Sequence, residues 1–224
     1  MLDLINSYYV LFVFWSTYFT ASLFFPTDQA KTRPSAQITD KKVVKKLFLN
    51  CLATMAIVPI LRQIPQLLFF SLTWLGYLIK WIMLPFMAET WFYHAHRLMH
   101  HKWFYRWHSD HHAFIQSHAL AGLYCSVVEM IFVNQLSIAI PYQILGLSMS
   151  EMMIFNVYVA ISTLRGHAGI YFRKDMPQWM PKFLINALSA SDHDIYHRVL
   201  THNFGVMYLF DRIYGTYQAE LRSE

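Results

Sequence analysis

Long stretches without charge constrain the fold of this chain more than any other feature. From Leu4 to Thr27 no residue is charged, which is enough chain for a helix of about 20 residues to cross ~30 Å of hydrocarbon. The chain is 56% hydrophobic and 14% charged, whereas a soluble domain carries about 25% charged residues. No basic residue precedes the stretch and no small-residue cleavage site follows it, so we expect a retained membrane helix rather than a cleaved signal.

Two longer apolar regions follow, from Leu47 to Tyr93 and from Ala113 to Leu164. We expect each to form a helical hairpin, with the second region broken by Pro141 and Gly146. Backbone groups in lipid must satisfy one another's hydrogen bonds, and the sequence has no alternating strand pattern. The sequence therefore predicts an all-α fold, a multi-pass membrane helical bundle built as one domain over residues 1–224.

The basic residues indicate which side of the membrane each segment faces. The net charge of +5 does not indicate a nucleic-acid partner, because the basic residues border apolar segments instead of forming a long basic tract. Pro26 to Lys46 is a polar, mostly basic link, which the positive-inside rule places in the cytoplasm. The segments around Arg97 and Arg165 and the tail from His193 onward then face the cytoplasm as well.

Histidines are the most unusual polar component of the chain. There are twelve, and eight of them fall between His94 and His118. His96 and His100 are four residues apart, and His193 is four before His197. His108 precedes the pair His111 and His112 by three and four. Residues at these spacings share a helix face, so each group can direct its imidazoles at one point. The pattern predicts a metal site.

Isolated histidines are interpreted differently from the grouped ones. His94 and His202 are interpreted as polar residues at a membrane interface. Grouped imidazoles in a region of low dielectric would be costly without a metal ion. Cys51 and Cys125 lie in apolar runs, which argues against a disulfide framework and against a cysteine-rich zinc site. An imidazole-rich site suits iron, copper, zinc or nickel, so ligand type leaves the metal open.

Together the histidine groups resemble the motifs of a known family. His96 to His100 matches an HRxxH box, His108 to His112 matches an HxxHH box, and Gly166 to Gly169 is similar to a GHSG element. The remaining elements, similar to HDxHH, NYG and DRxFGT, are His193 to His197, Asn203 to Gly205 and Asp211 to Thr216. From about residue 93 to residue 216 the chain thus resembles the fatty acid hydroxylase superfamily, also called the sterol desaturase family.

Two further comparisons with the family patterns refine the resemblance. In the methylsterol monooxygenase branch a Tyr-Ala-His-Pro-Leu-Glu element follows HxxHH; Tyr124 and Glu129 match its ends, while its histidine and proline are absent. We interpret this branch as the nearest. Tyr196 stands where the family usually has histidine. Three interpretations stay open. Tyr196 binds iron through its phenol oxygen, or it hydrogen-bonds an adjacent ligand, or His202 supplies the imidazole ligand that is missing at position 196.

The resemblance implies a non-haem di-metal site on the cytoplasmic face, holding two iron ions in the working enzyme, with zinc as an ion that the purified protein can carry. Its implied metal ligands are His96, His100, His108, His111, His112, His167, His193 and His197, with His118 as a further candidate. Asp110 and Asp194 are expected to orient ligating imidazoles, or alternatively to act as solvated acids or helix caps. With Tyr196 they are the residues we expect to assist catalysis. Asp211 and Arg212 are expected to form a structural pair that fixes the C-terminal segment.

The implied activity is an iron-dependent lipid hydroxylase or monooxygenase that acts on a sterol or fatty acyl lipid with molecular oxygen. No GxGxxG element occurs in the sequence, so we expect electrons from a separate membrane partner, a reductase or a b-type cytochrome. The membrane would be the endoplasmic reticulum in a eukaryote or the inner membrane in a bacterium. The alternatives are a membrane fatty acyl desaturase and a non-catalytic metal-binding membrane protein or transporter.

The charge pattern makes a prediction about orientation. We expect the amino terminus on the non-cytoplasmic side and the carboxyl terminus in the cytoplasm, because the basic link and the basic histidine segments both belong inside. Tags at the two termini, probed with protease in sealed vesicles, measure this directly. A carboxyl terminus protected from protease on the cytoplasmic side, together with an accessible amino terminus there, would reverse the topology.

Overall fold

The computed structural model describes residues 2–24, 40–61, 63, 67, 73–113, 119–167, 196–197 and 199–218, and within them every regular element is helical. The long helices are α1 (Leu2–Ser22), α2 (Asp40–Leu61), α3 (Trp74–Met99) and α6 (Met149–His167). A continuous run between α3 and α6 comprises α4 (Val127–Glu129), a π-helical turn (Met130–Gln135) and α5 (Leu136–Ile144). A short α9 (Leu209–Ile213) follows near the C-terminal end. The predicted all-α fold is confirmed for these residues.

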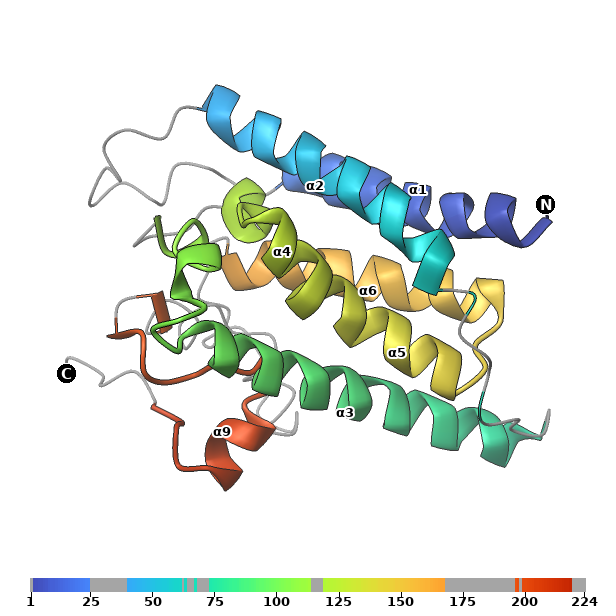
Figure 1. Ribbon diagram of the computed structural model, residues 1–224. Coiled ribbons are helices and arrows are strands. Elements are labelled where there is room, and N and C mark those ends of the chain that lie inside the picture. Colours follow the sequence, from blue (N-terminus) through green and yellow to red (C-terminus); the bar gives the residue numbers. More distant parts are fainter. Residues whose placement is uncertain are drawn as a thin grey trace.

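The helices lie side by side in a bundle, and several of them begin or finish at the same end. α1 packs along α6, α3 packs along α5, and α2 lies against the run that begins with α4. Figure 1 shows that α1, α3 and α6 finish at the same end of the bundle, where α2 and α4 begin. We call this the site end; α3 finishes there at Met99 and α6 at His167. α9 packs there against α3.

The second apolar region forms two helical runs that point in opposite directions, as predicted, and they contact each other near the turn, where Tyr142 donates to the carbonyl of Met152 at 3.2 Å. One detail of this prediction is wrong. The chain turns between α5 and α6 at Gly146, whose φ of 59° suits glycine. Pro141 does not end the helix as expected, because it lies inside α5, which continues to Ile144. Buried packing of α5 between its neighbours holds the helix through the proline. The first apolar region, predicted to form a hairpin, contains α2 and the beginning of α3. These two helices do not pack together as a hairpin, because α3 packs mainly on α5.

Buried polar contacts join α1 and α2 to the segment that leads into α4. The hydroxyl of Tyr18 donates to the carbonyl of Ala119 at 2.9 Å. The amide of Asn50 donates to the carbonyls of Leu123 and Cys125 at 3.0 and 3.1 Å. Buried polar groups are costly unless they are hydrogen-bonded. These contacts therefore fix the positions of α1 and α2 along the bundle relative to the site end.

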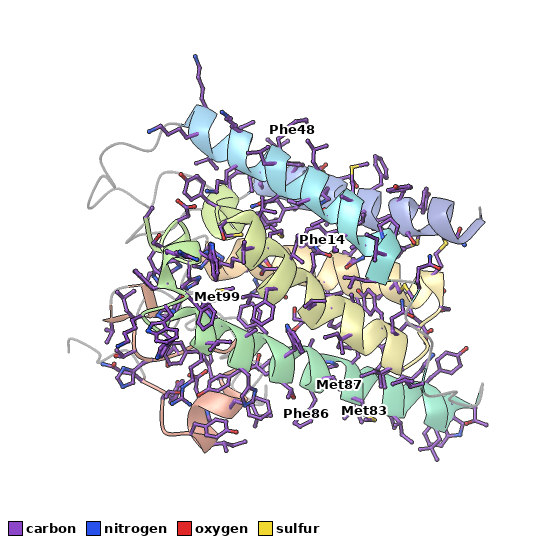
Figure 2. All side chains as sticks on the ribbon, viewed as in Figure 1. Phe14, Phe48, Met83, Phe86, Met87 and Met99 are labelled. Atoms are coloured by element: carbon purple, nitrogen blue, oxygen red, sulfur yellow. The ribbon has the colours of Figure 1, made fainter. Side chains whose placement is uncertain are left out.

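The outer faces of the bundle are apolar. Phe48 on α2 is 60% exposed and Phe86 on α3 is 48% exposed, whereas Phe14 of α1 is buried between helices (Figure 2). Among the described helices, the segments Lys41–Leu61 and Val127–Ile144 are long and apolar enough to cross a membrane. α1 forms a helix as expected, but its crossing of a membrane stays a prediction.

Two carboxylates hold the C-terminal segment at the site end. Asp211 accepts hydrogen bonds from the backbone N–H groups of Phe204 at 2.8 Å and Gly205 at 2.7 Å. Glu89 of α3 accepts from the next two N–H groups, of Val206 and Met207, at 3.0 and 3.1 Å. Four consecutive backbone donors are therefore bound by two acids, which confirms the structural role expected for Asp211.

We call these contacts of Glu89 and Asp211 with the backbone the carboxylate clamp. It can be tested at Gly205, where the two carboxylates leave no room for a side chain. A Cβ added there would meet the carboxylate oxygens of Glu89 and Asp211, the latter at 2.9 Å. We expect Gly205→Ala to lower the free energy of unfolding by about 1–3 kcal/mol, since both carboxylates are held by hydrogen bonds and cannot move aside freely.

The measurement is thermal unfolding in detergent. Gly166→Ala is the matched control, because a Cβ there meets nothing within 4 Å and alanine is the better helix former. Equal thermal midpoints for the two variants would contradict the clamp.

Candidate metal centre

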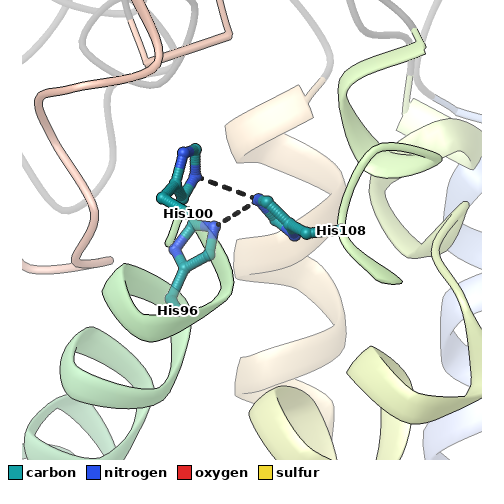
Figure 3. Close-up of side chains that lie close together, drawn as sticks. All are labelled: His96, His100 and His108. Carbon is teal, nitrogen blue, oxygen red and sulfur yellow. Dashed lines mark hydrogen bonds between the residues drawn. The ribbon is translucent and has the colours of Figure 1, made fainter. Parts of the chain in front are cut away.

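The last turn of α3 directs two imidazoles toward a third from the following segment. His96 and His100 lie one helical turn apart at the end of α3 and its C-cap. Figure 3 shows both rings facing His108. The Nε2 atom of His108 lies 3.2 Å from Nε2 of His96 and 3.1 Å from Nε2 of His100. The predicted convergence of the HRxxH pair with the next box is present.

The HxxHH box divides its histidines between two sites. The chain after α3 forms short 3-10 turns, Tyr105–Trp107 and His111–Ala113, instead of the expected helix. His112 joins His108, with their Nε2 atoms 2.9 Å apart. His111 turns toward other partners. We call His96, His100, His108 and His112 the four-imidazole group.

His111 belongs to a second cluster with two distant histidines. His167 comes from the end of α6 and His197 from the described pair 196–197. All three rings are buried, and one nitrogen from each lies within 4.8 Å of the others. We call them the three-imidazole group. Predicted ligand His193, predicted carboxylate Asp194 and candidate His118 lie outside the described residues.

Tyr196 lies at the centre of the four-imidazole group. Its hydroxyl oxygen is 2.5 Å from Nε2 of His96 and of His108, 2.6 Å from that of His112 and 2.8 Å from that of His100. The side chain is fully buried. Two of the roles considered for Tyr196, binding iron and hydrogen-bonding an adjacent ligand, both require such a position.

Fixed acceptors hold the other ring nitrogen of several imidazoles. Nδ1 of His96 lies 2.6 Å from the carbonyl oxygen of Phe204, and Nδ1 of His167 lies 2.8 Å from that of Thr163. Nδ1 of His108 lies 3.0 Å from a carboxylate oxygen of Glu129. A proton on Nδ1 suits the two carbonyl acceptors, which places the ring lone pair of His96 and of His167 on Nε2, the nitrogen that would bind a metal ion.

Sequence reasoning missed the role of Glu129. Its two carboxylate oxygens face Nδ1 of His108 at 3.0 Å and Nδ1 of His111 at 3.9 Å, so one buried acid contacts both histidine groups. The signal that could have revealed it is the match between Glu129 and the glutamate of the family element that follows the HxxHH box. Asp110, expected to orient an imidazole, forms an ion pair with Lys46 of α2; its action on a histidine stays a prediction.

Burial keeps the clustered imidazoles neutral. It lowers the pKa of His100 and of His112 to about 3, with a further contribution from the neighbouring His112 and His108 respectively. The pKa values of His108 and His111 are also lowered, mainly by burial and then by nearby imidazoles. Neutral rings carry the lone pairs that metal ligation requires.

The donor set fits metal ions. Within the four-imidazole group, four of the six pairs of Nε2 atoms lie 2.9–3.3 Å apart. Two nitrogens about 2.1 Å from one ion and at right angles lie about 3.0 Å apart. Neutral imidazoles that aim lone pairs at one another repel unless a cation lies between them. Each group could therefore hold one ion.

One cavity of about 150 Å³ reaches both groups. His96 borders it from the four-imidazole group, and His111 and His167 border it from the three-imidazole group. The rest of its lining is mostly apolar and includes Phe92, Met130, Ile138 and Phe155. An apolar cavity that ends at a cluster of metal-binding side chains suits a ligand with a hydrocarbon portion.

Comparison with known proteins agrees with these motifs. The family model described as fatty acid hydroxylase matches residues 81–216. The chain is similar to sphinganine C4-monooxygenase 1 of Arabidopsis thaliana, with 30% identity over 140 residues, 58% of this chain and 51% of that protein. It is also similar to methylsterol monooxygenase 2-2 of the same plant, with 28% identity over 141 residues, 60% of this chain and 51% of the relative.

A third relative is described by a different reaction. A very-long-chain aldehyde decarbonylase of Oryza sativa subsp. indica is 26% identical over 140 residues, 58% of this chain and 51% of the relative. The chain therefore spans about half the length of these curated relatives. No solved structure matches it.

The bridging position of Glu129 leads to a prediction about metal affinity. Glu129→Gln keeps the shape but replaces one of the two oxygen atoms that face Nδ1 atoms with an amide nitrogen, which cannot accept a hydrogen bond, so we expect metal affinity to fall about 10–100-fold. Competition with a chelator measures it.

Glu151→Gln is the matched control, since Glu151 is another poorly exposed helical acid but pairs with Lys80. We expect it to bind metal like the unchanged protein. Equal affinities for the two variants would show that Glu129 does not act on the histidine groups.

Proposed function

The chain belongs to the fatty acid hydroxylase family, and we propose that it oxidises a membrane lipid with molecular oxygen at a centre of two non-haem iron ions. The observation that carries the proposal is that the four-imidazole and three-imidazole groups border the same apolar cavity. Relatives named as sphinganine and methylsterol monooxygenases support a lipid substrate.

The described residues supply positions for the two ions. His96, His100, His108 and His112 would hold one, and His111, His167 and His197 would hold the other; we propose that His193 completes the second set. When bound, iron supplies the oxygen activation and electron transfer that amino-acid side chains cannot perform.

The protein would contribute binding, orientation and exclusion of water. Phe92, Met130 and Phe155 line the cavity and would hold the hydrocarbon part of a lipid beside the histidines. Burial of His111 and His167 keeps bulk water from this end of the cavity, which protects reactive species from side reactions. Glu129 would keep the Nδ1 proton of His108 in place, so that Nε2 remains the donor atom.

We further propose a multi-pass membrane topology with the site end in the cytoplasm. A separate membrane reductase or b-type cytochrome would deliver electrons there, in the endoplasmic reticulum or in a bacterial inner membrane. A hydroxylated product is our first expectation. The methylsterol and sphinganine relatives match at similar identity, so assignment to the methylsterol branch stays a prediction.

Metal analysis and lipid products test this function together. Eight grouped imidazoles exceed the needs of one ion, so we expect about two metal ions per chain in detergent-purified protein. His108→Ala and His197→Ala should each lose metal from their own group and lower lipid oxidation at least tenfold. The assay adds iron, a reductase and membrane lipids, and identifies products by mass spectrometry.

His101→Ala is the control, because His101 is exposed and adjoins the same box. It should retain metal and activity. Products with a new double bond and no added oxygen would favour a desaturase. Stoichiometric metal without any oxidised lipid would favour a non-catalytic metal-binding protein, and a metal-free protein that is folded and active would contradict the proposal.

A further inference from the structure

The hydroxyl of Tyr196 lies where four imidazole nitrogens meet. Its oxygen is between 2.5 and 2.8 Å from the Nε2 atoms of all four rings of the four-imidazole group. The rings come from α3 and from the turns that follow it, whereas Tyr196 approaches from the C-terminal part of the chain. The family pattern places an imidazole at this position, so the oxygen donor is a property of this chain.

Hydrogen bonds cannot account for all eight short contacts among the Tyr196 oxygen and the four Nε2 atoms, because each of these five atoms carries at most one proton. Nδ1 of His96 lies 2.6 Å from the carbonyl oxygen of Phe204, so this ring presents a lone pair at Nε2. A phenol has one proton to donate and two lone pairs of its own. When Tyr196 donates to His96, its own lone pairs face the remaining rings, and these rings have only the Nε2 protons of His100, His108 and His112 to share among their contacts.

A cation resolves this conflict. We propose that Tyr196 is a metal ligand, whose phenol oxygen binds the ion of the four-imidazole group together with its imidazoles. On binding, the phenol O–H bond breaks, the oxygen forms a bond to the ion, and the proton leaves to water. The inference rests on the proposed function, because it assumes that iron binds this group, and it adds an oxygen donor to one of the two ions.

The two ions would then differ chemically. The described ligands of the three-imidazole group are neutral nitrogens, whereas the four-imidazole group gains an anionic oxygen. An anionic oxygen is a harder ligand than imidazole and favours the ferric state. The ion at the four-imidazole group should therefore be the harder of the two to reduce.

Ferric iron bound to a phenolate absorbs visible light by charge transfer, which provides a readout independent of activity. The full chain is purified in detergent, loaded with iron and oxidised, and its visible absorption and resonance Raman spectra are recorded with the iron content. We expect the charge-transfer band and tyrosinate ring vibrations in the unchanged protein. Tyr196→Phe should lose both signals while it still binds iron through the imidazoles.

Two further variants isolate the effect. Tyr105→Phe removes a phenol whose ring stacks against His112 with centroids 6.2 Å apart, and it should keep the band. Tyr196→His replaces the oxygen donor with the imidazole of the family pattern, so it should bind iron fully and lack the band. Iron binding by Tyr196→His also shows that the altered site still folds.

Different experimental results would overturn this inference and the proposed function. An iron-loaded protein that oxidises lipid but shows no tyrosinate signal would overturn the ligand role of Tyr196 alone, as would a signal that survives in Tyr196→Phe. One iron per chain with no tyrosinate signal would mean that the hydroxyl fills the four-imidazole group in place of an ion. Failure of the unchanged protein to bind any iron would overturn both proposals.

Discussion

The orientation of the buried imidazoles depends on acceptors fixed against their Nδ1 atoms. The carbonyl of Phe204 fixes His96, the carbonyl of Thr163 fixes His167, and Glu129 faces His108. Much of the surrounding structure serves to place these acceptors. Asp211 holds the backbone at Phe204, and Thr163 lies on α6 one turn before His167. Without such partners the rings could rotate, and their Nε2 lone pairs would not meet.

Glu129 shows how the helices and the site depend on each other. It ends α4, and the π-helical turn Met130–Gln135 follows at once. A π-helical turn leaves backbone groups without their usual partners, and such turns recur at functional sites. Here the indole of Trp91 on α3 donates to the carbonyl of Phe132 at 2.7 Å. The irregular turn thus joins α3, which carries His96, to the helix that carries the bridging acid.

The sequence predicted the components of the site better than their arrangement. Apolar runs located the helices, and the four-residue spacing correctly brought His96 and His100 to one face. Helix-face reasoning failed for His111 and His112, because the chain there forms 3-10 turns that send adjacent residues to different groups. The central position of Tyr196 depends on contacts with residues far away in the chain, such as His108, which is 88 residues earlier. Local spacing carries no information about such contacts.

The two histidine groups differ in their access to the cavity and to the surface. His111, His167 and His197 are all buried, and two of them border the cavity. In the four-imidazole group only His96 borders it, while His100 and His112 are partly exposed. Under the proposed function, a lipid in the cavity therefore meets mainly the three-imidazole group, and an electron donor docking at the site end approaches the four-imidazole group. With the oxygen ligand proposed for Tyr196, the ion nearer the electron donor would also be the ion that is harder to reduce.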